Sequence, residues 1–126
     1  NSAVYQMNPD GSGVQRVSDP AGNAFAPVWD DASDLIAYES TVTGELEVFV
    51  YQLSSGTTRQ LTEGGTNFSP TWICSSPTIV WASNVTGNHD LFMSNALPIS
   101  APPLQMEQRE ASQLTSDPGQ DEFPNS

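Results

Sequence analysis

The sequence contains no lysine, and its three arginines stand against fifteen aspartates and glutamates, which gives a net charge of −12. Phosphate backbones and anionic membrane surfaces are bound through clusters of lysine and arginine. The composition therefore excludes nucleic acid as a partner and leaves a basic protein or a cation. Only 14% of the residues are charged, and the acids are scattered, so we do not expect a disordered acidic tail.

Cysteine and histidine are almost absent. Cys74 is the single cysteine, which excludes an intrachain disulfide and a cysteine-based zinc cluster. His89 is the single histidine, so the usual histidine metal triad cannot form, and no Gly-x-Ser-x-Gly motif marks a serine nucleophile. No apolar run approaches the ~20 residues of a membrane-spanning helix. These absences predict a protein that is not an enzyme, has no cofactor and does not insert into a membrane.

The sequence does contain a repeat. A Phe-x-Pro-x-Trp motif at residues 68–72 also stands at residues 25–29, 43 positions earlier. Phe123-Pro124, where the two residues are adjacent, is interpreted as the opening of a third copy. When residues 24–44 are aligned with residues 67–87, nine of the 21 positions are identical. A period this regular is typical of repeat architectures and decides the fold before any single residue does.

Each period contains four short apolar segments separated by turn signals, which is typical of antiparallel strands. Pro27 lacks the amide hydrogen that a β-ladder needs, so we expect its strand to be bulged or unpaired on one side. In the first period, strands are predicted at residues 25–29, 35–40, 48–51 and 57–61. In the second they are predicted at residues 69–73, 78–82, 90–94 and 111–115, and an earlier pair at residues 3–7 and 14–17.

Three motifs of the repeat point to a family. They are Asn-Pro-Asp-Gly-Ser-Gly at residues 8–13, Pro-Val-Trp at residues 27–29 and Ile-Ala-Tyr-Glu-Ser at residues 36–40. In this order they resemble the blade repeat of the TolB-type β-propellers, and similar repeats occur in the propellers of prolyl-oligopeptidase-like peptidases. That family usually continues the tryptophan with Ser-Pro-Asp-Gly, whereas residues 30–33 and 73–76 have lost the glycine. The resemblance implies an all-β fold of propeller blades, each with four antiparallel strands.

The resemblance also implies how the chain is divided. Residues 1–18 correspond to the two outer strands of a partial blade, residues 24–62 and 67–116 to two full blades, and residues 121–126 to the start of a further blade. Residues 95–110 are an insertion in the second full blade. Because a propeller ring needs four or more blades, we expect an incomplete ring that other polypeptide completes. Since no charged and apolar leader opens the chain, we expect a mature product, a fragment or an excerpt.

Acidic residues follow the last strand of three successive copies, at Asp19, Glu63 and Asp117. In a four-stranded meander these positions fall at the end of the propeller that carries the connections between blades. The resemblance implies that ligands of propellers usually bind at that end. The three acids are therefore candidates for binding a cation or a basic partner, with solvated turn residues as the alternative.

A second candidate site lies in the first turn, where Asn8, Asp10 and Ser12 carry oxygen atoms at alternate positions, as in calcium-binding loops. The calcium signature also requires further acids and a distal glutamate, which this turn lacks. A plain hairpin turn is the alternative interpretation. No other metal site is predicted.

The insertion at residues 95–110 is the one segment that does not repeat, and it places apolar side chains among prolines. Leu97, Ile99, Leu104 and Met106 are candidates for docking in extended form on a neighbour. A surface insertion that is merely tolerated is the alternative.

Aromatic residues and prolines recur at equivalent places of the repeat, which is typical of packing anchors between blades and not of a sugar-stacking platform. The predicted anchors are Phe25, Pro27, Trp29, Phe68, Pro70, Trp72 and Trp81.

Together these observations predict a non-enzymatic propeller segment that serves protein–protein interaction or extracellular assembly. Two alternatives stay open: a fragment of the regulatory propeller of a serine peptidase, or a propeller that binds a cation or carbohydrate. The absence of lysine, together with abundant serine, threonine and asparagine, favours a periplasmic, cell-surface or secreted location.

Overall fold

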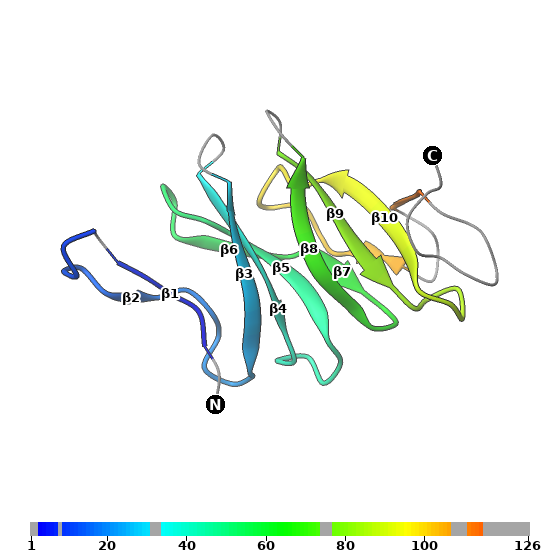
Figure 1. The fold of residues 1–126 in the computed structure, drawn as a ribbon, viewed down its shortest axis with the longest axis horizontal. Coiled ribbons are helices and arrows are strands. Elements are labelled where there is room, and N and C mark those ends of the chain that lie inside the picture. The colour runs from blue at the N-terminus through cyan, green and yellow to red at the C-terminus, as the bar shows by residue number, and fades with distance from the viewer. Residues whose placement is uncertain (1–2, 8, 31–33, 74–76, 107–110, 115–126) are drawn as a thin grey trace.

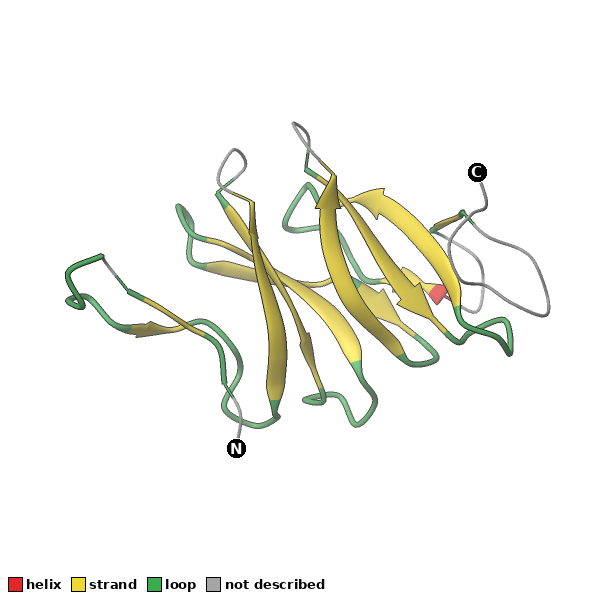
Figure 2. Ribbon diagram, in the orientation of Figure 1, coloured by secondary structure: helices red, strands yellow, loops and turns green. Residues whose placement is uncertain are grey.

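The chain folds into two four-stranded antiparallel sheets that stand side by side, with a small hairpin at the N-terminal end (Figure 1). The computed structural model describes residues 3–7, 9–30, 34–73, 77–106 and 111–114. Strands and short loops account for nearly all of these residues (Figure 2). None of the described residues belongs to a helix that is long and apolar enough to cross a membrane. The predicted all-β fold class is confirmed.

The two large sheets are meanders in which the order in space follows the order in the chain, as in propeller blades. The hairpin contains β1 (Tyr5–Gln6) and β2 (Gln15–Arg16). The first blade contains β3 (Ala24–Asp30), β4 (Leu35–Ser40), β5 (Glu47–Gln52) and β6 (Thr57–Gln60). The second blade contains β8 (Asn67–Ile73), β9 (Thr78–Ser83), β10 (Asp90–Asn95) and β12 (Ser112–Gln113). These sheets form part of a propeller and, in the described residues, no closed ring.

The innermost strand of each blade is bulged next to its proline. In the pairing of β3 with β4 the register shifts between Phe25 and Val28, and β8 shows the same shift. Ala26 and Ser69, which precede the prolines, have φ angles of 52° and 54°, a left-handed conformation that residues with a side chain usually avoid. The bulge predicted at Pro27 is confirmed, because the missing amide hydrogen interrupts the ladder at that position.

The first blade buries both of its faces, because alternate residues of β4 and β5 point to opposite sides of the sheet. One face packs in a core cluster with the second blade, and its members from the first blade include Leu35, Ala37, Val48 and Val50. The other face packs with Val4 and Val17 of the hairpin, and its members are Ile36, Tyr38, Phe49 and Tyr51. The apolar run predicted at residues 35–40 is therefore a strand covered on both faces.

A stacked aromatic pair repeats in the two blades. The rings of Tyr38 and Phe49 are 5.7 Å apart with an interplanar angle of 12°, and the rings of Trp81 and Phe92 are 6.4 Å apart at 22°. Each pair joins the second and third strands of its blade. The 43-residue period thus repeats this aromatic pair as well as the backbone.

The insertion leaves the second blade and returns along the first one. Within it, β11 (Leu104–Gln105) pairs in parallel with β7 (Thr62–Glu63), the short strand that follows the first blade. The amide of Leu104 donates to the carbonyl of Leu61 at 2.8 Å, and Met106 is fully buried. The insertion therefore lies in extended form against the preceding blade of the same chain.

Candidate binding surface at the blade junctions

Two junctions hold the chain together, and they share a backbone pattern. The first junction lies between the hairpin β1–β2 and the first blade, and the second junction lies between the two blades. At the first, the amide of Val4 donates to Ser18 Oγ at 3.1 Å. Before the second, the amide of Val48 donates to Thr62 Oγ1 at 3.0 Å. The matching hydrogen bonds, 44 residues apart, establish which residues correspond.

The second junction contains a buried carboxylate. Glu47 is 3% exposed and accepts hydrogen bonds from Thr62 Oγ1 at 2.7 Å, Asn67 Nδ2 at 2.8 Å and the amide of Gly64 at 3.1 Å. The indole of Trp81 donates in turn to Asn67 Oδ1 at 3.2 Å. Burial raises the pKa of Glu47, while these neutral donors oppose the rise. The network links the outer part of the first blade to the inner strands of the second.

The first junction has no carboxylate at the corresponding place. The positions equivalent to Glu47 and Asn67 are Ala3 and Ala24, and the position equivalent to Trp81 is Tyr38. Burial raises the pKa of Tyr38 to about 12, although a hydrogen bond with a nearby threonine hydroxyl opposes the rise. This junction is therefore lined by smaller and less polar side chains than the second one.

Arg59 fixes the insertion to the first blade. It is 5% exposed, and its guanidinium donates to the carbonyls of Ala96 at 2.8 Å, Pro102 at 3.3 Å and Asn95 at 3.5 Å. Burial lowers its pKa, and its Nε has no hydrogen-bond partner among the residues that the structure describes. The positive charge thus organises backbone carbonyls of the insertion and is not available to an external ligand.

The acidic candidates occupy matching positions but are not brought together. Asp19 Oδ1 accepts a hydrogen bond from the amide of Ala21 at 2.8 Å, within its own turn. Glu63 Oε1 accepts one from Gln105 Nε2 at 2.7 Å, which ties it to the insertion. Asp117 lies outside the described residues. Asp19 and Glu63 are exposed, yet each already has a local partner.

The calcium candidates form a compact turn. Asp10 Oδ1 accepts hydrogen bonds from the amide of Ser12 at 2.9 Å and from its hydroxyl at 2.6 Å, and these bonds lower the pKa of Asp10. Asn8 lies outside the described residues. Among the residues that the structure describes, no group of three or more His, Cys, Asp or Glu side chains is arranged to hold a metal ion.

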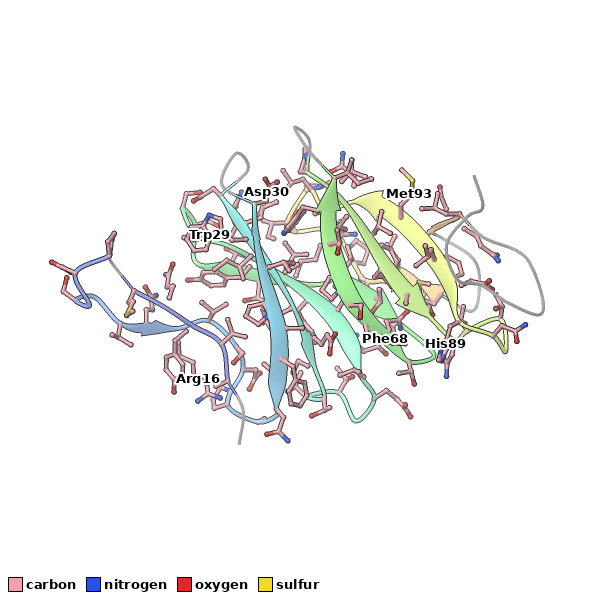
Figure 3. The ribbon with its side chains drawn as sticks, viewed as in Figure 1. Arg16, Trp29, Asp30, Phe68, His89 and Met93 are labelled. Carbon is pink, nitrogen blue, oxygen red and sulfur yellow. The ribbon has the colours of Figure 1, made fainter. Side chains whose placement is uncertain are left out.

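The two repeated tryptophans have different surroundings. Trp72 is half-buried and its Nε1 donates to the carbonyl of Val28 in the first blade at 3.0 Å. Trp29, at the same position of the repeat, is 51% exposed and lies at the edge of the first blade (Figure 3). It borders a cavity of about 420 Å³ together with Met7 and Leu53. The tryptophan that has a neighbouring blade anchors to it, and the one that lacks a full blade stays exposed.

The remaining predicted anchors follow the same division. Pro70 is buried and Phe68 half-buried, with the ring of Phe68 5.3 Å from the ring of His89 in an edge-to-face arrangement (Figure 3). Phe25 is 39% exposed, and Pro27 is exposed as well. Trp81, with 0% exposure, is the most deeply packed of the set.

The apolar candidates of the insertion are used inside the chain. Leu97, Ile99 and Leu104 are half-buried against the core of the second junction, and Met106 is 0% exposed. The prediction that Met106 contacts a partner molecule requires correction, because a fully buried side chain has no surface to offer. Residues 107–110, the end of the predicted insertion, lie outside the described residues.

Sequence reasoning missed the roles of Glu47, Asn67 and Arg59. A signal was present for one of them. Glu47 and Asp90 are acids 43 residues apart and both are 3% exposed. The aligned repeat ended before these positions, and a charged residue on a strand is usually exposed. Their burial depends on which elements pack around them.

The geometry defines the class of the molecule as a β-propeller segment, with its blades joined by aromatic and polar anchors. A comparison with solved structures finds the putative TolB from Agrobacterium tumefaciens, with a TM-score of 0.61, 15% identity, and coverage of 74% of this chain and 37% of that one. The chain thus spans little more than a third of that protein. No protein-family model and no curated protein matches the sequence. The structural similarity confirms the TolB-like propeller fold that the blade motifs predicted.

Proposed function

We propose that the chain is a non-enzymatic part of a β-propeller that serves as a protein-interaction scaffold, with its ring completed by further polypeptide. The observation that carries this proposal is the contrast between the two tryptophans. Trp72 donates its indole hydrogen to the adjacent inner strand at 3.0 Å, whereas Trp29 is 51% exposed beside a hairpin that supplies only two strands. A further pair of strands next to β1 would give Trp29 the neighbour that Trp72 already has.

The far face of the second blade supports the same proposal. Val50 and Ala37, on the first blade, are completely buried by the second blade. Their counterparts Met93 and Val80 are only half-buried, and Met93 lies at the outer side of the second blade (Figure 3). Ile73, on the same blade, is 41% exposed. An apolar sheet face of this kind is suited to packing against another blade.

The surroundings of the single histidine support a role without catalysis. His89 is exposed in a turn of the second blade and packs edge-to-face against Phe68. A serine nucleophile would need a histidine within hydrogen-bond distance that a third group orients. The aromatic contact accounts for His89 as a structural residue.

We also propose an extracytoplasmic location. The lysine-free composition and the single cysteine support it, as does the similarity of the blade motifs to the TolB-type propellers. Fractionation of cells that express the native gene product tests this part of the proposal; recovery in the cytoplasm alone would overturn it.

Sedimentation velocity tests the scaffold proposal. If the open faces take further polypeptide, the 126-residue chain should associate in a concentration-dependent way. Met93→Asp and Trp29→Asp, on the two open faces, should each weaken this association, whereas Glu45→Gln in an exposed turn should leave it unchanged. Circular dichroism of each variant checks that the sheets are retained. A chain that sediments as a folded monomer at every concentration would contradict the proposal.

A further inference from the structure

A cavity of about 260 Å³ opens at the first junction, between the hairpin and the first blade. Its floor is aromatic, because Tyr38 and Phe49 stack there at 5.7 Å. Asp19 and Thr58, at its border, are exposed, so the cavity can be reached from solvent. We call it the first-junction groove; its lining residues are Val17, Ser18, Asp19, Pro20, Tyr38, Ser40, Val42, Phe49 and Thr58.

The equivalent place at the second junction is filled by the insertion. The counterparts of Tyr38 and Phe49 are Trp81 and Phe92, and both are 0% exposed. They belong to the same core cluster as Met106, and Leu104 packs against that cluster. The chain itself therefore shows what occupies such a site: a short extended segment with apolar side chains that point into the junction.

The backbone at the first-junction groove has the same binding groups. At the second junction, the carbonyl of Leu61 accepts the amide of Leu104 at 2.8 Å, and the two short strands run in parallel. Val17 is the counterpart of Leu61, because the amide of Val17 donates to the carbonyl of Val4 and the amide of Leu61 to the carbonyl of Val48, both at 2.8 Å. Within the described part of the chain, no donor to the carbonyl of Val17 is found. This acceptor is placed to receive an extended segment.

The charge of the groove indicates the middle residue of that segment. Gln105, between the two apolar residues of the insertion, donates to Glu63 at 2.7 Å. The counterpart of Glu63 is Asp19, which is exposed. A polar donor at the middle position would reach it, and a lysine or arginine would add charge attraction to a chain with a net charge of −12.

We propose that the first-junction groove binds an extended segment of a partner polypeptide with the pattern apolar, basic or amide, apolar, which lies parallel to residues 17–19. Such strand addition uses main-chain hydrogen bonds for affinity and side-chain pockets for specificity. The proposal extends the scaffold role by naming a partner chemistry, but it rests on the internal comparison of the two junctions. Completion of the ring is a separate event at other faces.

Titration with synthetic peptides tests the proposal. The first probe reproduces residues 100–106, Ser-Ala-Pro-Pro-Leu-Gln-Met, and the second has lysine in place of the glutamine. Both should bind saturably by calorimetry, the lysine peptide more tightly at low salt. A third peptide, with serine in place of leucine and methionine, should bind at least about tenfold more weakly, which corresponds to about 1.4 kcal/mol.

Matched variants locate the binding. Thr58→Trp fills the groove and should weaken both peptides at least about tenfold, whereas Thr57→Trp on the same strand lies outside the lining and should not. Asp19→Asn should remove the advantage of the lysine peptide, and Glu45→Gln should keep it. If no peptide saturates at about 1 mM, or if Thr58→Trp binds as the unmodified chain does, the groove is not the site.

The two proposals fail separately. If the chain stays monomeric in sedimentation but binds the peptides, the scaffold proposal is wrong and the groove proposal stands. If the chain associates through Met93 and Trp29 but does not bind the peptides, the groove proposal is wrong and the scaffold proposal stands.

Discussion

The two junctions of this chain have the same backbone design and different contents. In both, a valine amide is bonded to a serine or threonine hydroxyl 14 residues later, and an aromatic pair stacks beside it. The second junction adds a buried glutamate with three donors and a methionine from the insertion. The first has alanines and a cavity of about 260 Å³. Repetition of the backbone thus does not require repetition of the packing.

The difference between the junctions shows that small side chains alone do not close a junction. Where Ala24 replaces Asn67, there is no side-chain amide to bridge a carboxylate and an indole. Where no insertion lies along the strand, a cavity remains beside the aromatic pair, and its border residues Asp19 and Thr58 are exposed. We therefore expect the second junction to be the more stable one, whereas the first has a cavity with room for a ligand.

The largest expected effect comes from the aromatic pair of the second junction. Trp81→Ala should lower the free energy of unfolding by about 3–5 kcal/mol, because it removes a fully buried ring and leaves Asn67 without its indole partner. Tyr38→Ala should cost at least about 1 kcal/mol less, because its surroundings already contain a cavity. Urea denaturation measures both; equal losses would break the comparison of the junctions.

The next effect concerns the buried arginine. Arg59→Met should lower stability by about 1.5–3 kcal/mol, because the carbonyls of Ala96 and Pro102 lose a charged donor. Limited proteolysis should then cut within residues 95–106 sooner than in the unmodified chain. Arg16→Met, at a half-buried position of the hairpin where the guanidinium donates to the carbonyl of Ser18 at 2.9 Å, should lower stability by less, about 0.5–1 kcal/mol. Early cleavage in both variants would contradict a specific anchoring role for Arg59.

A pH-dependent effect should separate the junctions further. Burial raises the pKa of Glu47 in the folded chain, so its protonated form is favoured by folding. Its contribution is fully present below the unfolded pKa, about 4.3, and is lost as the pH rises through the folded pKa. The slope is at most about 1.4 kcal/mol per pH unit. Denaturation of the unmodified chain and of Glu47→Gln at several pH values isolates this slope as their difference.

A control for that measurement is Glu45→Gln, which removes an exposed carboxylate two residues away. The pH dependence of its stability should match that of the unmodified chain. If Glu47→Gln also matches the unmodified chain, the carboxylate of Glu47 is not buried in solution.

The smallest effect concerns a single hydrogen bond. Trp72→Phe keeps an aromatic ring but removes the donor to Val28, and it should lower stability by about 0.5–1.5 kcal/mol. Trp29→Phe removes no such bond within the described part of the chain and should change stability by less than about 0.5 kcal/mol. Denaturation followed by circular dichroism measures both. In a longer polypeptide that adds further strands next to the hairpin β1–β2, the two substitutions should become similar.

Much of the architecture could be predicted from local pattern. Strand β4 was predicted at its observed bounds, and the bulge at Pro27 followed from the missing amide hydrogen. Strand β8, by contrast, begins two residues before the predicted Ser69, because the end of a strand depends on its partner. The path of the insertion along β7 could not be predicted either, since it joins residues that are far apart in the chain.

The sequence by itself determined the period of 43 residues, the four-stranded blades and the alternation of faces, because these depend on residue type and spacing alone. Only the tertiary structure decided that Glu47 and Arg59 are buried, that Met106 fills one junction and that the other keeps a groove. The reason is that burial is a property of neighbours. The same tryptophan position is an anchor at residue 72 and an exposed ring at residue 29, because only one of them has a blade beside it.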